Sequence, residues 1–133
     1  MAKHTVFVLG NPLLEEDSLP LRLLPGLREA FPAVEFREID PTEDLRVLGR
    51  RPILIDTVVG PKDVVVLNGT ERVEDGPKCS MHDMDLGMSL KLMTKAGMID
   101  SVTIIGVPAA MKEKEALEKT KRILPNELRM YWE

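Results

Sequence analysis

The run Thr5-Val6-Phe7-Val8-Leu9 is apolar after its first residue and stops at Gly10. A continuous apolar run of this length indicates a strand buried on both faces, which is typical of a parallel sheet covered by helices. Two later runs, Ile53-Leu54-Ile55 and Ser101–Val107, predict further strands of this sheet. We therefore expect the fold to be built around residues 5–9 as a buried parallel strand.

Helical spacing of apolar residues predicts the elements between these strands. Four segments show it: residues 18–31, 41–48, 85–98 and 111–124. Within the first, Pro25 is expected to kink or shorten the helix, because proline lacks the N–H of an internal helical bond. The second is expected to begin at Thr42, the third to close near Gly97, and the last to stop at Pro125.

Two more strands complete the predicted sheet. Residues Val34–Ile39 alternate with period two, as a half-buried strand should. Residues Val64–Leu67 follow Ile53–Ile55 after a connection too short for a crossover helix, so these two strands are expected to be antiparallel neighbours. The order predicts a single α/β domain over residues 1–133: three layers, with a twisted, mostly parallel five-stranded sheet, one antiparallel strand and helices on both faces.

Composition and charge exclude several classes of function. The net charge of −4 and the pI near 5.3 argue against a nucleic-acid partner, which needs a basic face. The apolar runs are too short for a signal peptide or a membrane span. A single cysteine, Cys79, rules out an internal disulfide and a multi-cysteine metal cluster. We expect a cytoplasmic protein that contacts no membrane; its oligomeric state is left open.

Three potential metal ligands are predicted near one edge of the sheet. Asp17 lies in the loop after the first strand, Asp56 ends the run Ile53–Ile55, and His82 stands just before the helical pattern of residues 85–98. Functional groups gather at the carboxyl ends of parallel strands, and two carboxylates with an imidazole suit a divalent borderline metal. Each also has a structural interpretation: the two aspartates as caps of a helix or turn, and the histidine as a satisfied structural residue.

Other motifs carry less chemistry. Neither a dinucleotide-binding nor a P-loop pattern follows Gly10, and no nucleophile elbow is present. The thiol of Cys79 has no orienting partner in the sequence, so we interpret it as a buried or incidental group. Met81, Met84 and Met88 recur at helical spacing. They are expected to fill the core, with an adaptable apolar surface as the alternative.

Four motifs together resemble the hydrogenase maturation endopeptidases, which process the large subunit of nickel-iron hydrogenases. They are the loop Leu9–Asp17 with its Gly-Asn and an acid six residues later, the acid in Ile55-Asp56, the segment Met81-His82-Asp83, and the strand end Ile105-Gly106-Val107-Pro108. The resemblance runs from Val6 to Leu124. The chain departs from it after Asp17, where Ser18-Leu19-Pro20 replaces the usual small residues.

The resemblance implies a function and a site. Asp17, Asp56 and His82, here called the trio, would bind nickel that is already inserted in the hydrogenase precursor and carried by it. The enzyme would then remove a short C-terminal peptide from that large subunit, either as an aspartic-type peptidase or with the nickel as direct catalyst. No resident cofactor is expected. The alternatives are a non-catalytic nickel-sensing chaperone of the precursor on the same fold, and an unrelated small α/β binding domain.

Overall fold

The computed structural model describes residues 4–11, 13–14, 17–40, 44–69, 80–81 and 84–129, with the backbone alone for 80–81 and 84–86. The strands are β1 (His4–Val8), β2 (Val34–Glu38), β3 (Ile53–Val59), β4 (Val65–Asn68), β5 (Ser80–Met81) and β6 (Thr103–Pro108). The helices are α1 (Leu19–Arg22), α2 (Leu24–Ala30), α4 (Met84–Lys95), α5 (Glu113–Arg129) and the 3₁₀ helix η2 (Leu45–Leu48).

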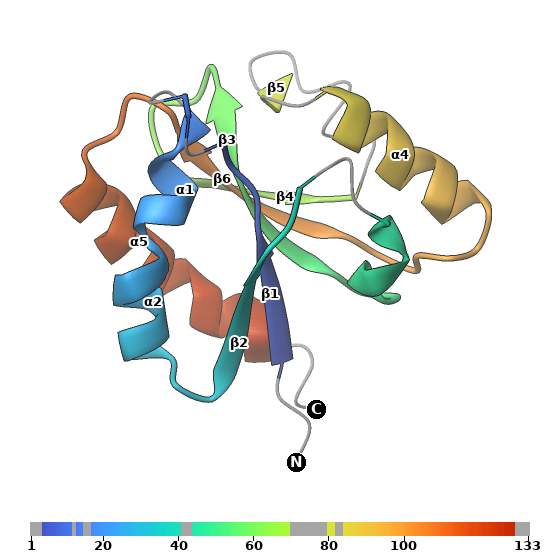
Figure 1. The fold of residues 1–133 in the computed structure, drawn as a ribbon, viewed down its shortest axis with the longest axis horizontal. Coiled ribbons are helices and arrows are strands. Elements are labelled where there is room, and N and C mark those ends of the chain that lie inside the picture. The colour runs from blue at the N-terminus through green and yellow to red at the C-terminus, as the bar shows by residue number, and fades with distance from the viewer. Residues whose placement is uncertain are drawn as a thin grey trace.

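The main sheet has the strand order β2-β1-β3-β6-β4. Its pairs are parallel except β4 with β6, and the two-residue β5 adds a short antiparallel pair to β3. In Figure 1, α1, α2 and α5 cover one face of the sheet, while α4 and η2 lie on the other. The predicted three-layer α/β fold with a mostly parallel five-stranded sheet is confirmed; β5 was not predicted.

The predicted neighbours of one strand were wrong. β4 does run opposite to β3, but it pairs with β6, which lies between them. The connection of residues 60–64 needs to cross only two strand spacings, about 10 Å, and five extended residues reach roughly 16 Å. A short connection therefore determines that the second strand runs antiparallel to the first, but it is long enough for a later strand to lie between the two.

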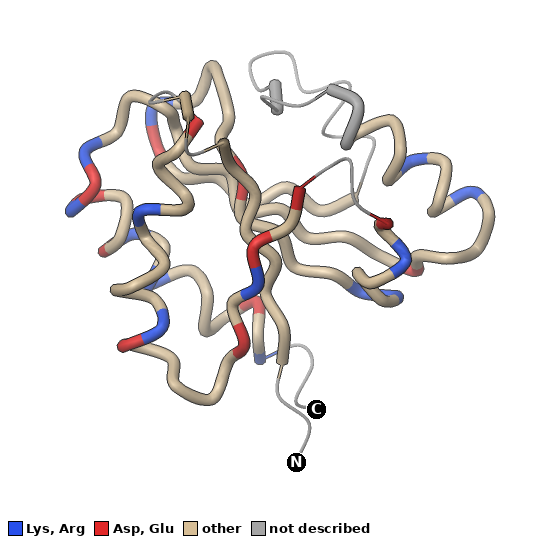
Figure 2. The backbone as a smooth tube through the Cα atoms, viewed as in Figure 1, with Lys and Arg blue, Asp and Glu red and all other residues tan. Residues whose placement is uncertain are grey.

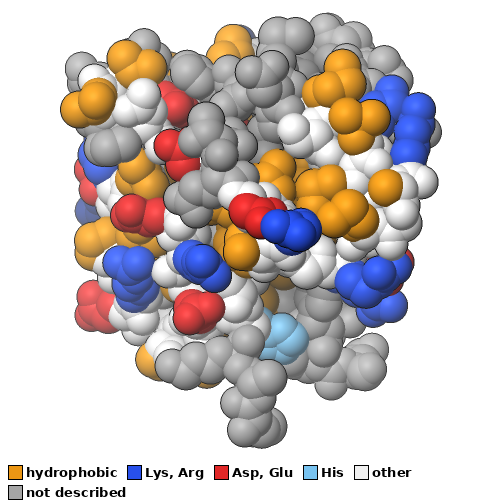
Figure 3. All heavy atoms as spheres, turned by 45° about the vertical axis from the view of Figure 1, so that its right-hand side comes forward, with side chains coloured by type: hydrophobic (Ala, Val, Ile, Leu, Met, Phe, Trp, Pro, Cys, Tyr) orange, Lys and Arg blue, Asp and Glu red, His pale blue; other side chains and the backbone are white. Residues whose placement is uncertain are grey.

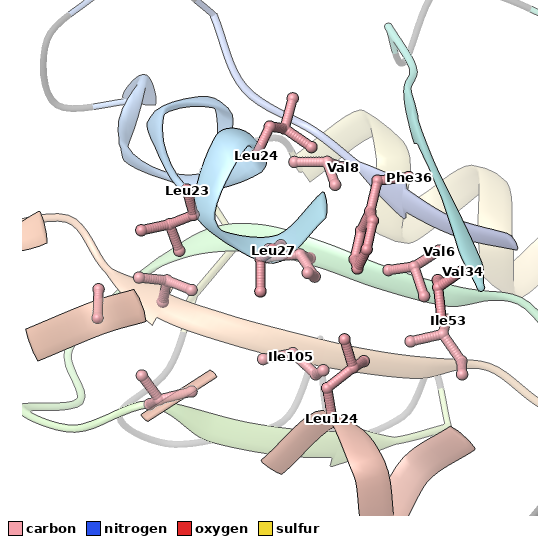
Figure 4. Packing of buried hydrophobic residues seen from close by; sticks show 14 of the residues in the cluster. Val6, Val8, Leu23, Leu24, Leu27, Val34, Phe36, Ile53, Ile105 and Leu124 are labelled. Carbon is pink, nitrogen blue, oxygen red and sulfur yellow. The ribbon is translucent and has the colours of Figure 1, made fainter. Parts of the chain in front are cut away.

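Alternation along the central strands divides the core in two. Val6 and Val8 face α1, α2 and α5, and Figure 4 shows them with Leu27, Ile105 and Leu124 in that cluster. Phe7 and Leu54 face the other way and pack with Leu90 of α4 and Leu48 of η2. Because both sides of β1 and β3 are covered, their sequences are continuously apolar rather than alternating.

The proline positions decide where the helices break. The predicted helix 18–31 is divided into α1 and α2 at Leu23, with prolines in the first turn of each part, so the break expected near Pro25 is confirmed. The predicted stop at Pro125 was wrong, because α5 continues through this residue to Arg129. Leu128 is 1% exposed, and burying it on the sheet offsets the backbone bond that Pro125 cannot make.

The short helix η2 begins later than predicted. Asp44 precedes it and accepts a hydrogen bond from the Arg46 backbone N–H at 3.0 Å, so Asp44 is its N-cap. Thr42, the predicted start, lies outside the described residues. Among the described residues no helix is long and apolar enough to cross a membrane.

Candidate functional site

The loop after β1 folds into a closed turn that ends at Asp17. Asn11 Oδ1 accepts a hydrogen bond from the Leu13 N–H at 2.9 Å, and its carbonyl accepts one from the Leu14 N–H at 3.1 Å. The Asp17 N–H in turn donates to the Leu14 carbonyl at 3.0 Å, and the Asn11 N–H donates to the Asp17 carbonyl at 2.9 Å. The side chain of Asn11 thus starts an Asx turn, and the loop returns Asp17 to the end of β1.

Gly10 makes this return possible. A Cβ atom at residue 10 would lie 2.7 Å from the Asp17 carbonyl oxygen and 2.9 Å from Cγ of Leu21. Those contacts are too short for any side chain, so the close approach requires glycine. The sequence signal was a glycine directly after a strand, but only the folded loop shows what it accommodates.

Asp17 does not cap the following helix. The residue before α1 is Ser18, and its side chain makes no capping hydrogen bond. The Ser18 hydroxyl instead accepts a bond from Arg22 Nε at 3.2 Å, and Arg22 also lies 3.6 Å from a carboxylate oxygen of Glu113. The Asp17 side chain is 8% exposed, so the loop holds it largely away from water.

Asp56 was predicted to end its strand, and this was wrong. It lies in the middle of β3, paired with Gly106 of β6. β1, however, pairs with β3 only as far as Ile55, where the Leu9 N–H donates to the Ile55 carbonyl at 2.9 Å. β3 continues beyond the last residue that pairs with β1. Asp56 therefore lies at the carboxyl edge of the sheet on the side of β1.

The end of β1 leaves a notch beside β3. Alternate residues of a strand direct their backbone N–H and C=O groups to the same neighbouring strand. The backbone groups of Thr57 therefore face the same side as those of Ile55, the side of β1. β5 pairs with β3 only beyond this point, at Val58 and Val59. The Thr57 N–H donates instead to Oδ1 of Asp56 at 2.8 Å. The Asp56 carboxylate therefore satisfies a backbone donor inside the notch, which orients it.

Leu9 and Asn11 connect the backbone next to each aspartate to the end of β1. The Leu9 N–H binds the residue before Asp56, and the Asn11 N–H binds Asp17 itself. The two acids are 8% and 2% exposed. Carboxylates withdrawn from water in this way are stabilised by hydrogen bonds, by a cation or by a metal ion. The arrangement could hold a divalent metal or position a general base.

His82, the third member of the trio, lies outside the described residues, as does Cys79. Met81, directly before His82, pairs with Val58 of β3, two residues beyond Asp56. The other histidine, His4, begins β1 at the opposite edge, roughly 16 Å of extended strand from Leu9. Within the described part of the chain, no three His, Cys, Asp or Glu side chains are gathered so as to hold a metal ion.

The methionine prediction was wrong for Met88, which is 56% exposed on α4 instead of filling the core. Gly87 and Leu90 form the buried side of this helix. The side chains of Met81 and Met84 are outside the described atoms. The alternative interpretation, an adaptable apolar surface, therefore fits the one methionine of the three that is described.

The chain matches no protein-family model, no curated protein and no solved structure. The candidate site rests on the geometry of the two aspartates and on the sequence motifs. Asp56 lies at the carboxyl edge as defined by the end of β1, and open α/β sheets bind ligands at this edge.

Proposed function

We propose that this protein is an endopeptidase that removes a C-terminal peptide from the nickel-loaded large-subunit precursor of a nickel-iron hydrogenase. The observation that carries the proposal is the pair of nearly buried carboxylates, Asp17 and Asp56. The carbonyl of Asp17 accepts the Asn11 N–H, and the carbonyl of the residue before Asp56 accepts the Leu9 N–H. The resemblance of the loop and of the segment around His82 to the maturation endopeptidases supports the choice of substrate.

In this proposal the trio recognises nickel that arrives with the substrate. Carboxylate oxygens and a neutral imidazole are suitable nickel ligands. Bound nickel would polarise the scissile carbonyl or lower the pKa of a water molecule. Asp56 enters the reaction already oriented, because its Oδ1 accepts the Thr57 N–H. One aspartate can serve instead as the general base, with nickel only positioning the tail.

The test is cleavage of the precursor with and without nickel, followed by the mass of the large subunit. We expect loss of a C-terminal peptide only from the nickel-loaded precursor. Asp56→Asn keeps an acceptor for the Thr57 N–H but removes the charge, so cleavage should fall by at least about 100-fold. Asp63→Asn is the control, because Asp63 is exposed and its carboxylate pairs with Lys119 of α5 at 2.7 Å.

Other outcomes point elsewhere. Binding of the nickel-loaded precursor without any loss of mass would favour the nickel-sensing chaperone. Full cleavage by Asp17→Asn, Asp56→Asn and His82→Ala variants would contradict a role for the trio.

A further inference from the structure

The helix α4 exposes two neighbouring apolar side chains on its outer side. Gly87 and Leu90 are buried on the inner side, whereas Met88 and Leu92 are 56% and 60% exposed. Residues four apart on a helix lie on the same side, so Met88 and Leu92 form one stripe. Figure 3, in which α4 and η2 come forward, shows hydrophobic side chains gathered on this face. The charged residues at the two ends of the stripe indicate what covers it.

An acidic and a basic position extend the stripe at its two ends. Helical spacing places Asp85 three residues before Met88, and Lys95 three residues after Leu92, on the same side of the helix. The spacing of these four positions, three, four and three, is that of a coiled-coil seam. Figure 2 shows that the described second half of α4 carries basic residues and no acid. The stripe is therefore acidic at its amino end, apolar in its centre and basic at its carboxyl end.

This order is self-complementary when two copies of α4 lie antiparallel. With Leu90 level with the two-fold axis, each residue of one copy faces the residue equally far beyond Leu90 on the other. Met88 then faces Leu92 of the second copy, and Asp85 faces its Lys95. Two-fold symmetry makes each contact twice. Parallel pairing would instead bring like charges together at both ends, which is unfavourable. The sequence of the helix thus matches a second copy of itself in one orientation.

We infer that two copies of this chain associate through α4, antiparallel and with two-fold symmetry. Met88 and Leu92 form the apolar centre, and Asp85 with Lys95 forms an ion pair at each end. A stripe of this length is too small for the roughly 1,200 Å² of a stable interface, so the dimer is weak and depends on concentration. Beyond the end of α4, Arg50 is already paired with Asp100 at 2.7 Å, so its charge does not oppose the contact. The inference does not depend on the proposed function.

Sedimentation equilibrium of the purified chain, from about 10 μM to about 1 mM, tests the surface. We expect wild-type protein to change from monomer to dimer over this range. Leu92→Lys places an ammonium against Met88 of the second copy, and the Kd of the dimer should rise by at least about tenfold. Leu13→Lys is the matched control, because Leu13 is an exposed leucine in the loop after β1. This control should keep the wild-type Kd.

A mixing experiment tests the antiparallel orientation. Met88→Glu alone places a carboxylate against Leu92 of the second copy, so it should also be monomeric where wild type dimerises. In an equimolar mixture of Met88→Glu and Leu92→Lys, the introduced carboxylate faces the introduced ammonium, and the unchanged Leu92 faces the unchanged Met88. We expect the mixture to form a dimer at concentrations where each variant alone is monomeric. Parallel helices would not bring the two introduced charges together.

Three results would overturn the inference. The first is wild-type protein that stays monomeric up to about 1 mM, which would assign the stripe to no second copy of this chain. The second is a dimer that Leu92→Lys leaves as strong as Leu13→Lys does, because the contact then uses another surface. The third is a mixture that stays monomeric, which excludes the antiparallel pairing. Thermal unfolding of each variant confirms that it is folded before it is mixed.

Discussion

At the scale of single residues, Gly10 determines whether Asp17 reaches the site. In Gly10→Ala the new methyl group would meet the Asp17 carbonyl oxygen at 2.7 Å, so the loop must move. We expect the free energy of unfolding to fall by about 1–3 kcal/mol, as for other overpacked sites. Cleavage of the precursor should fall as well, beyond the loss that reduced stability explains. Urea unfolding and initial rates at a temperature where the variant is folded measure the two effects.

Gly97→Ala is the control for that variant. Gly97 has a φ of +78° after α4, with nothing within 4 Å of an added Cβ, so alanine is strained by its backbone alone. A loss of about 1–2 kcal/mol is expected there, because the left-handed region is unfavourable for L-residues. Cleavage should remain at the wild-type rate. Equal losses of activity in both variants would show that Gly10 has no particular influence on the site.

At the scale of elements, α5 carries a buried hydroxyl on its sheet-facing side. Thr120 is 0% exposed, between Ala116 and Leu124, and its Oγ1 has no hydrogen-bond partner among the described residues. Thr120→Val removes this desolvated hydroxyl and keeps the β-branched shape. We expect the free energy of unfolding to rise by about 1 kcal/mol, measured by urea denaturation.

Thr94 on α4 gives the matched comparison. Its Oγ1 donates to the Leu90 carbonyl at 2.8 Å, so Thr94→Val removes a hydroxyl that has a partner. This variant should be neutral or destabilised by up to about 1 kcal/mol. If Thr120→Val is destabilised more than Thr94→Val, the Thr120 hydroxyl makes a hydrogen bond in solution and the prediction is wrong.

At the scale of the whole molecule, two exposed ion pairs join segments that are distant in sequence. Arg50 binds the Asp100 carboxylate with contacts of 2.7 and 3.0 Å, and Lys119 binds Asp63 at 2.7 Å. These hydrogen bonds lower the pKa values of Asp100 and Asp63 below their usual range. Arg46 lowers the pKa of Asp44 in the same way, to about 2.

These shifts predict how stability depends on pH. The three carboxyls have lower pKa values in the folded state, so the unfolded chain binds more protons once the pH falls to their ordinary value of 3.8. Their stabilisation is present above that pH and is lost as the pH falls towards 2. Urea midpoints between pH 7 and pH 2 measure the loss. Asp63→Asn should flatten this decline, and the difference from wild type should shrink in high salt, because exposed pairs are screened.

The trio shows how far sequence alone reaches at the site. Asp17 was singled out in the loop after a predicted strand and Asp56 at the end of an apolar run. In the structure the Asn11 N–H donates to the Asp17 carbonyl, and the Leu9 N–H donates to the carbonyl of the residue before Asp56. The reason given for Asp56 was wrong, because β3 continues beyond it. Whether an acid stands at an edge depends on where the neighbouring strand ends, and the register with β1 is not visible in the apolar pattern of β3. His82 remains a prediction.

Local patterns were sufficient for the fold class. Continuous apolar runs such as Thr5–Leu9 determined that the sheet is buried on both faces, and helical spacing determined the order of its covering helices. Tertiary packing alone decided that β6 enters between β3 and β4, that α5 continues through Pro125, and that Gly10 lies against Asp17. The physical reason is that periodicity reports which face of an element is buried. Which element packs beside another depends on contacts between residues far apart in the chain.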